Sequence, residues 1–279
     1  MFVIAKYHDV LRQLVLDTME GAKVFRGELI KNHKGRRDIQ RIVVAVAGGQ
    51  PLTFFLKRNW QPYKKDGLKS LFTRGEVWSQ ARTEWENSLA LQRAGITVAE
   101  PVAFGEECGL LWEKFSFIIT AAARGEMTLD QFIRTGIDAN ERRRVFDALA
   151  REVRKMHDAG LASPDLFARH IFVERGREPK FCLIDMARLD RHLRLSSERR
   201  ARDLAALNIT APLRFVSIRE RLRFLLTYGG EHQLFWRTEA RTRHLLKRRK
   251  FADFLTAAGD NNAADHSLSR DPRKSRDHL

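Results

Sequence analysis

The sequence has few cysteines and no long apolar run, and each of these features excludes some classes of protein. Its two cysteines, Cys108 and Cys182, are too few for a disulfide framework or a cysteine metal site, so we expect a reducing compartment. No apolar stretch approaches the roughly 20 residues of a membrane-spanning helix. Lys6, His8 and Asp9 interrupt the N-terminal segment, so we expect no signal peptide and a cytoplasmic protein.

Acidic residues are also scarce relative to basic ones. The net charge is +16 and the pI about 10.4, which favours an anionic partner. The sequence has no zinc-finger spacing, RNP-like aromatic motif or coiled-coil basic region, so we expect no specific recognition of nucleic acid. We expect peripheral contact with an anionic membrane surface instead, with the basic helix predicted over Leu234–Leu255 as one candidate contact. A solvated basic helix face and nucleic-acid binding through charge alone remain alternatives.

The N-terminal half reads as a helix followed by a β-meander and a second helix. Residues 3–19 have an apolar face at helical spacing. A second helix is predicted between Gly75 and Gly95. Three β-rich runs lie between the two helices, and the third run ends in Lys57. Two more β-rich runs follow the second helix. The five predicted strands are Phe25–Ile30, Asp38–Val46, Leu52–Lys57, Val102–Glu106 and Phe115–Thr120.

The turn between the first two predicted strands, Lys31–Arg37, contains a single glycine, Gly35. A glycine-rich phosphate loop would lie at this position, and its glycine motif is absent. Backbone amides together with Lys34, Arg36 and Arg37 are candidate phosphate ligands. A solvated basic hairpin fits the same residues equally well.

The pattern changes to long helices after Ala121–Gly125, which we take as a boundary between two lobes. The expected organisation is an N-terminal helix (1–24), a mainly β lobe (25–122), a mainly helical lobe (123–258) and a disordered polar tail (259–279). Within the second lobe, Glu141–Ala159 is strongly amphipathic and stops at Gly160.

Two aspartates follow this helix. Asp165 lies on a short loop, and Asp185 comes directly after the apolar run Phe181–Ile184. Either residue alone would be read as an ordinary turn or strand-end aspartate. The pair, about twenty residues apart and downstream of Lys57, is typical of ATP-dependent phosphotransferases of the protein-kinase fold.

Seven strings run in order along the chain: GELIKNHKGRRD, FFLKRNW, ARTEWENSLALQRAGITVAEPVAFGE, SFIITAAARG, MHDAGLASPDLFARHIFV, FCLIDMARLDR and RDLAALN. As a set they resemble the lipopolysaccharide-core kinases of Gram-negative bacteria, the Kdo and heptose kinases of the protein-kinase-like superfamily. The resemblance implies an α+β, two-lobed fold: an antiparallel sheet with one αC-type helix, then a mostly helical lobe. It implies ATP and Mg²⁺ as cofactors and a Kdo or heptose hydroxyl of the lipopolysaccharide inner core as acceptor. It also implies a peripheral location on the cytoplasmic face of the inner membrane; the oligomeric state stays open.

The resemblance also implies roles for individual residues. Lys57 would bind the ATP phosphates with Glu84 as its ion-pair partner, and Glu86 is the competing candidate. Asp165 would orient the acceptor hydroxyl as catalytic base. Asp185 and His170 would hold the metal. Two further residues, Asp203 and His157, would support the catalytic loop without touching substrate.

The chain departs from the family pattern at three points. Ser163-Pro164 stands where His-Arg usually precedes the catalytic aspartate, Asp185-Met186-Ala187 replaces the usual DFG, and Ala121–Ala123 lacks the usual hinge carboxylate. We expect an active enzyme because four residues remain: Lys57, Glu84, Asp165 and Asp185. A kinase for another small molecule or a protein, and a pseudokinase binding module, are the alternatives.

Overall fold

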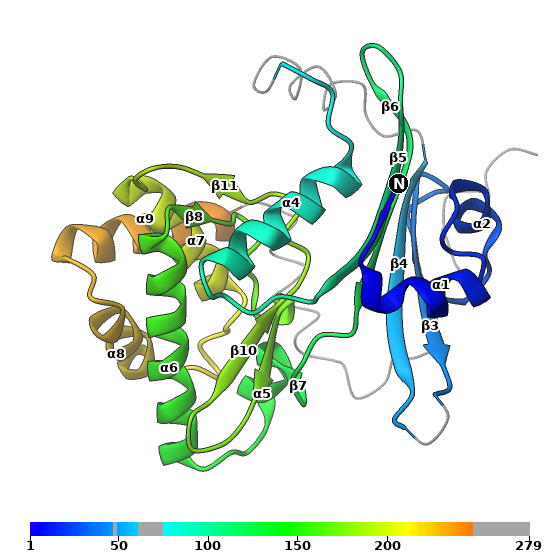
Figure 1. Cartoon of the computed structure of the whole chain (residues 1–279). Coiled ribbons are helices and arrows are strands. Elements are labelled where there is room, and N and C mark those ends of the chain that lie inside the picture. The colour runs from blue at the N-terminus through cyan, green and yellow to red at the C-terminus, as the bar shows by residue number, and fades with distance from the viewer. Residues whose placement is uncertain (47–48, 61–74, 248–279) are drawn as a thin grey trace, which may run out of the picture.

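The structure is a computed structural model, which describes residues 1–46, 49–60 and 75–247. A β-sheet lobe comes first along the chain and a helical lobe second, with helix α4 (Gln80–Arg93) between them (Figure 1). The α+β architecture predicted from the sequence is therefore confirmed. None of the helices within these residues has the length and apolar content needed to cross a membrane.

The first lobe is a six-stranded antiparallel sheet with strand order β1-β5-β6-β4-β3-β2. Side chains alternate between its two faces along β4, so Phe54, Leu56 and Arg58 lie on one face while Lys57 lies on the other. The helices α1 (His8–Gln13) and α2 (Met19–Val24) cover the first of these faces (Figure 1). The strands are β1 (Phe2–Val3), β2 (Glu28–Asn32), β3 (Arg37–Val44), β4 (Leu52–Trp60), β5 (Pro101–Cys108) and β6 (Glu113–Ala121).

The single helix expected over residues 3–19 is wrong. The chain instead forms β1, a 3₁₀ turn (Ala5–Tyr7) and then α1, which stops at a left-handed Val15 with φ of 57°. The Leu16 N–H donates to the Leu11 carbonyl across this stop at 2.8 Å. Thr18 then caps α2 by accepting from the Gly21 N–H. The break turns both Leu11 and Leu16 into the core, which one straight helix would not do.

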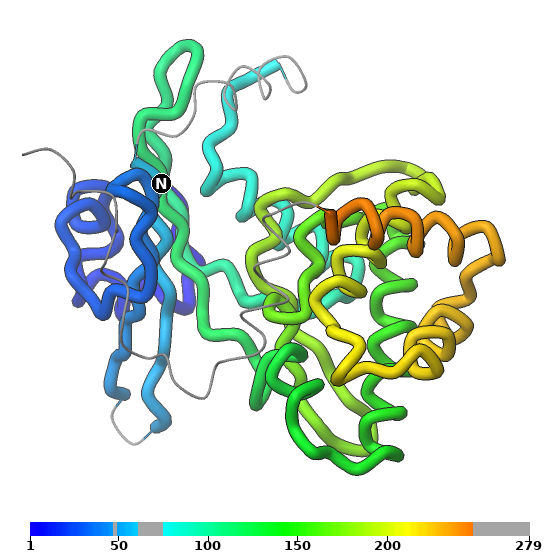
Figure 2. Tube along the Cα trace, turned by 180° about the vertical axis from the view of Figure 1, so that it is seen from behind, coloured from blue at the N-terminus to red at the C-terminus, as the bar shows by residue number. Residues whose placement is uncertain are grey.

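The second lobe is built on α6 (Ala139–Asp158), whose apolar face packs into the largest core cluster. The chain leaves α6 at Gly160, as predicted. The φ of Gly160 is 77°, and a Cβ there would lie 1.9 Å from the His192 carbonyl oxygen. Figure 2 shows the remaining helices wrapped around α6 from the other side. They are α5 (Leu129–Arg134), α7 (Ser197–Ile209), α8 (Ile218–Tyr228) and α9 (His232–Leu246), with short strands β7 (Met127–Thr128), β8 (Leu161–Ala162), β9 (Ile171–Glu174), β10 (Lys180–Leu183) and β11 (Asp190–Arg191).

A short bridge ties the two lobes together next to the second predicted aspartate. The Leu183 N–H donates to the Thr97 carbonyl, and the Ala99 N–H donates to the Leu183 carbonyl, both at 2.9 Å. The end of β10 is therefore anchored to the segment that follows α4. The predicted polar tail, 259–279, and the end of the basic helix beyond residue 247 lie outside the described residues.

Candidate active site

Lys57 of the β-sheet lobe contacts a residue of the helical lobe at the candidate site. Its Nζ lies 2.6 Å from Glu84 Oε1 on α4 and 3.4 Å from Asp185 Oδ1 on the loop after β10. The lysine and Glu84 are both buried, whereas Asp185 is partly exposed. The structure therefore brings together three residues that the sequence predicted as partners. It also places Glu84, and not Glu86, against the lysine.

The three charges stabilise one another. Burial works against the ammonium of Lys57, but the carboxylates of Glu84 and Asp185 raise its pKa above the ordinary value. Burial likewise opposes the charge of Asp185, yet Lys57, Arg37 and His170 lower its pKa to about 2. At neutral pH the lysine is therefore cationic and Asp185 is an anion, the forms needed to bind phosphate and a divalent cation.

The loop that carries Asp185 is held in an unusual conformation. Asp185 has a φ of 58°, a left-handed backbone that aspartate tolerates better than most residues. The Asn87 side chain donates to the carbonyls of Met186, at 2.9 Å, and Ala187, at 3.2 Å. Asn87 lies three residues after Glu84, on the same side of α4. One helix thus positions both the lysine and the metal-binding candidate, and sequence analysis missed Asn87.

The loop that carries Asp165 is fixed from below by a buried polar network. The carboxylate of Asp203 accepts from the Ser163 backbone N–H and, at 3.3 Å, from Nε2–H of His157. The other ring nitrogen of His157 accepts from the Tyr228 hydroxyl at 2.8 Å. The Ser163 hydroxyl then accepts from the Asp165 N–H at 3.3 Å.

This network accounts for the departure at Ser163-Pro164. The main-chain N–H of residue 163 is the group that Asp203 holds, and any residue but proline supplies it. The serine hydroxyl adds a second hold on the loop that histidine at this position would not give in the same way. The loop is therefore positioned without the usual His-Arg pair.

His170 faces Asp185 across the candidate metal position. Its Nδ1–H donates to the Asp165 carbonyl at 2.9 Å, whereas its Nε2 accepts from Arg169 Nε–H at 3.2 Å and lies 4.0 Å from Asp185 Oδ2. Burial lowers the pKa of His170 despite the nearby carboxylates, so the ring is neutral at pH 7. An ionised carboxylate completed by phosphate oxygens and waters is a donor set that suits Mg²⁺, so Asp185 fits such an ion. Imidazole is a less usual ligand for it.

Two arginines lie near these residues: Arg37, a candidate phosphate ligand from the sequence, and Arg188, which was not singled out. Arg37, at the start of β3, lies 3.7 Å from Asp185 Oδ1, and its buried Nε has no hydrogen-bond partner within the described residues. Arg188 donates to Asp165 Oδ1 at 3.0 Å and is largely exposed. Lys34 and Arg36 are exposed on the turn before β3. The strand register supports the choice of Arg37, because Ile39 pairs with Lys57 and Arg37 lies two residues before Ile39, on the same face of the sheet.

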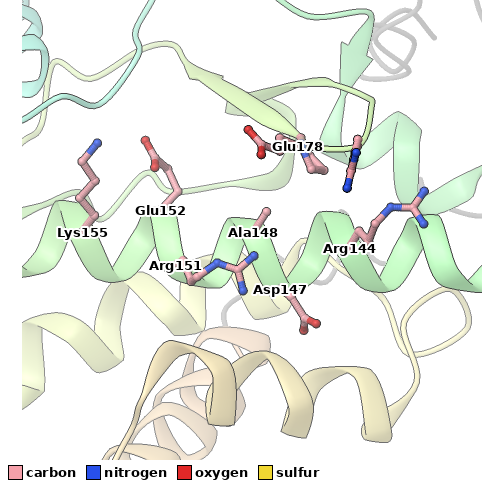
Figure 3. Close-up of a pocket in the computed structure, with 9 residues that line it drawn as sticks. Arg144, Asp147, Ala148, Arg151, Glu152, Lys155 and Glu178 are labelled. Carbon is pink, nitrogen blue, oxygen red and sulfur yellow. The ribbon is translucent and has the colours of Figure 1, made fainter.

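A hollow of about 430 Å³ lies elsewhere, between α6 and the turn joining β9 to β10 (Figure 3). Its walls mix both signs of charge, including Arg144 and Lys155 with Glu152 and Glu178. Burial raises the pKa of Glu152. None of the predicted site residues lines this hollow, and its mixed charges do not favour a polyanion such as ATP.

A buried lysine–glutamate pair in a β-lobe, set against two loop aspartates from a helical lobe, defines a phosphotransferase of the protein-kinase-like class. Residues 22–228 match the family model of the lipopolysaccharide kinase (Kdo/WaaP) family. The chain belongs to this family and is a kinase, as the sequence motifs predicted.

Known proteins agree with this assignment. The chain is 28% identical over 224 residues to the lipopolysaccharide core heptose(I) kinase WaaP of Pseudomonas aeruginosa, covering 76% of this chain and 80% of that protein. It is 26% identical over 221 residues to the same enzyme of Escherichia coli, covering 76% and 81%. A solved structure of WaaP in complex with acyl carrier protein aligns with a TM-score of 0.65 at 24% identity, over 91% of this chain and 99% of that one. The predicted fold class is thereby confirmed.

Proposed function

We propose that the protein transfers the γ-phosphate of ATP to a Kdo or heptose hydroxyl of the lipopolysaccharide inner core. The observation that carries this proposal is the position of Lys57, which is paired with Glu84 and also contacts Asp185 from the other lobe. Phosphoryl transfer requires little covalent chemistry from a protein. It requires positioned cations for the phosphates and a positioned partner for the hydroxyl.

The residues divide this work between them. Lys57 and Arg37 bind phosphate oxygens, and Asp185 holds Mg²⁺ with His170 beside it. A Mg²⁺ ion held by Asp185 would neutralise negative charge on the nucleotide phosphates. Asp165 accepts a hydrogen bond from the acceptor hydroxyl, for which Arg188 must yield its hold on Oδ1. Lys34 and Arg36 attract phosphate from the exposed turn.

The acceptor is supported by the family and by charge. The relatives from Pseudomonas aeruginosa and Escherichia coli are both named lipopolysaccharide core heptose(I) kinases. The net charge of +16 suits an anionic glycolipid in an anionic leaflet, and we infer that the enzyme works peripherally at the cytoplasmic face of the inner membrane.

The proposal is tested by incubating the protein with Mg-ATP and lipopolysaccharide core acceptors and locating new phosphate by mass spectrometry. Asp165→Asn should lower turnover by about 10²–10⁴-fold, the usual share of a general base, while ATP binding persists. Asp130→Asn is the matched control, because Asp130 pairs with Arg134 on α5 and is not assigned to the site. Unchanged turnover in Asp165→Asn contradicts its role. Thermal stabilisation by Mg-ATP without phosphate on any acceptor favours the pseudokinase alternative.

We further propose acyl carrier protein as a partner, because the solved relative is a complex with it. The supporting observation is a cavity of about 580 Å³ among α6, α7, α8 and α9, a volume typical of small-molecule sites. Apolar side chains dominate its lining, which suits the acyl chain that such a carrier bears. The lining includes Phe146, Leu204, Leu225 and Phe235.

A rim substitution tests this partner without emptying the core. Leu222 lines the cavity but is 40% exposed, so Leu222→Lys should fold and should weaken binding of acylated carrier protein about tenfold by placing a charge at the entrance. Leu226→Lys, on the same helix but outside the lining, is the control. Equal binding of acylated and unacylated carrier protein by the unsubstituted chain contradicts the role of the cavity.

A further inference from the structure

The hairpin between β5 and β6 ends in two leucines that the fold does not require. The Gly109 N–H donates to the Trp112 carbonyl at 2.8 Å, so Leu110 and Leu111 are the two central residues of the turn. Leu110 is 95% exposed, Leu111 43% and Trp112 39%. Neither leucine has a positive φ, so most residues fit this turn, and polar residues are the common choice at such positions. Neither turn formation nor burial therefore explains this apolar tip.

The tip projects beyond the rest of the sheet. The described part of β4 ends at Trp60, which pairs with Phe115, whereas the β5–β6 ladder continues to the pair Cys108 and Glu113. Phe115 pairs with Glu107, so at about 3.3 Å per residue Leu110 lies about 10 Å further along the hairpin than this pair. Figures 1 and 2 show this hairpin standing clear of the helical lobe. A flat surface can reach the tip without obstruction from the helices.

The tip lies at the phosphate end of the sheet. Arg37 pairs with Asn59, and Asn59 pairs with Ser116, so the basic turn before β3 lies at the same end as the hairpin tip. Arg37, like Lys57, lies close to Asp185. The interlobe connection begins after Ala121, which pairs with Phe54 near the opposite end of β4. A surface in contact with the tip therefore faces the phosphate-binding end and not the hinge.

The charges around the tip suit an anionic surface. The acidic residues of the hairpin are engaged by the protein: Glu107 accepts from Lys23 at 2.6 Å, and Glu113 accepts from the Gln80 N–H at 2.9 Å. The neighbouring turn exposes basic side chains, Lys34 and Arg36 among them. Leucine and tryptophan flanked by cations are the combination that enters the headgroup layer of an anionic bilayer.

We propose that the tip Leu110-Leu111-Trp112 inserts into the headgroup layer of an anionic lipid bilayer, with the basic turn 31–37 lying against the same surface. This contact turns the phosphate end of the site toward the leaflet. In the basic helix that the sequence offered as one candidate contact, acidic partners offset part of the charge, because Arg243 pairs with Glu239 at 3.0 Å and Arg237 lies 3.7 Å from Glu198. Membrane binding by the tip does not depend on the proposed function. Its role does, because the role is to bring a lipid-anchored acceptor to the site.

The test uses the full chain and vesicles of phosphatidylethanolamine and phosphatidylglycerol that contain no acceptor and no ATP. The double variant Leu110→Ser with Leu111→Asn places polar residues that are common in turns at two positions without positive φ, so the hairpin should fold as well as before. Its vesicle binding in a sedimentation assay should fall about tenfold or more, because two apolar side chains no longer enter the interface. Leu226→Asn, which removes an exposed leucine from α8, should bind as the unsubstituted chain does.

Charge is tested separately from apolar insertion. Lys34→Gln with Arg36→Gln should weaken binding about tenfold in low salt and reduce its salt dependence. The double leucine variant should instead keep the salt dependence of the unsubstituted chain.

Three results would overturn the proposal: no vesicle binding by the unsubstituted chain, equal binding by the double leucine variant, or a change only in oligomeric state measured by light scattering. Kinase assays separate this outcome from failure of the proposed function. If both hold, the leucine variant phosphorylates a delipidated core oligosaccharide normally and vesicle-bound lipopolysaccharide poorly. If only the function fails, neither acceptor is phosphorylated and the difference in vesicle binding persists.

Discussion

Lys57 and Arg58 are neighbours on β4, yet their side chains form buried ion pairs on opposite faces of the sheet. Lys57 pairs with Glu84 under α4, on the side of the helical lobe. Arg58 pairs with Asp38, at 2.8 Å, on the side covered by α1 and α2. Burial is similar for the two cations, at 9% and 3% exposed. Burial and ion pairing alone therefore do not distinguish a site from a structural support.

The two pairs differ in what surrounds them. The Arg58 guanidinium binds Asp38 through Nε and Nη2, and its Nη1 donates to the carbonyls of Ala22, Lys23 and Phe25 at the end of α2. Protein groups therefore accept the hydrogen bonds of the Arg58 guanidinium through all three of its nitrogens. Lys57 instead shares its charge with Asp185, whose side chain is 37% exposed. The pair at the candidate site is therefore the one that also contacts a partly exposed carboxylate, that of Asp185.

Reciprocal substitutions that keep the charge should separate the two roles most strongly. Lys57→Arg replaces a compact ammonium by a planar guanidinium, so kcat/KM should fall about 10²–10³-fold with only about 1 kcal/mol lost in the free energy of unfolding. Arg58→Lys should do the opposite. It leaves carbonyls of α2 without donors, so the free energy of unfolding should fall by about 2–3 kcal/mol while kcat/KM of the folded protein stays unchanged.

Steady-state kinetics and chemical denaturation of both variants measure these effects. The comparison breaks if Arg58→Lys lowers kcat/KM as strongly as Lys57→Arg does at an equal folded fraction. That result would mean that α2 and the outer face of the sheet also set the geometry of the site.

Sequence reasoning found the residues whose positions follow from local pattern. Lys57 ends an apolar strand run, Glu84 lies on an amphipathic helix, and Asp185 follows another strand run. Their order along the chain carried the family resemblance, and the resemblance assigned their roles. Sequence reasoning missed Asn87 and Arg188, because their partners lie 99 and 23 residues away and no period in the sequence relates them. The Arg58–Asp38 pair was missed for the same reason. The break of the N-terminal helix at Val15 was missed because tertiary packing of Leu11 and Leu16 overrode a continuous helical pattern.

A third ion pair, in the helical lobe, gives a baseline for the two buried ones. Glu220 accepts from Arg142 at 2.5 Å and from the Ser217 N–H at 2.7 Å, and its side chain is 28% exposed. Burial opposes its charge, but the hydrogen bonds from Arg142 and Ser217 lower its pKa. Because solvent screens a pair of this exposure, Glu220→Gln should cost only about 0.5–1 kcal/mol at neutral pH.

The pH dependence of this small difference has a definite sign. A carboxylate with a lowered pKa in the folded state contributes stability above its unfolded pKa of about 4.3, and loses it as the pH falls through the folded value. The gap in unfolding free energy between the unsubstituted chain and Glu220→Gln should therefore be constant from pH 7 to about pH 5.5 and close below it. Denaturant titrations across this range measure the gap. A gap that widens on acidification would show that Glu220 is stabilised by its protonated form, and the exposed pair would then no longer serve as the weak reference for Lys57 and Arg58.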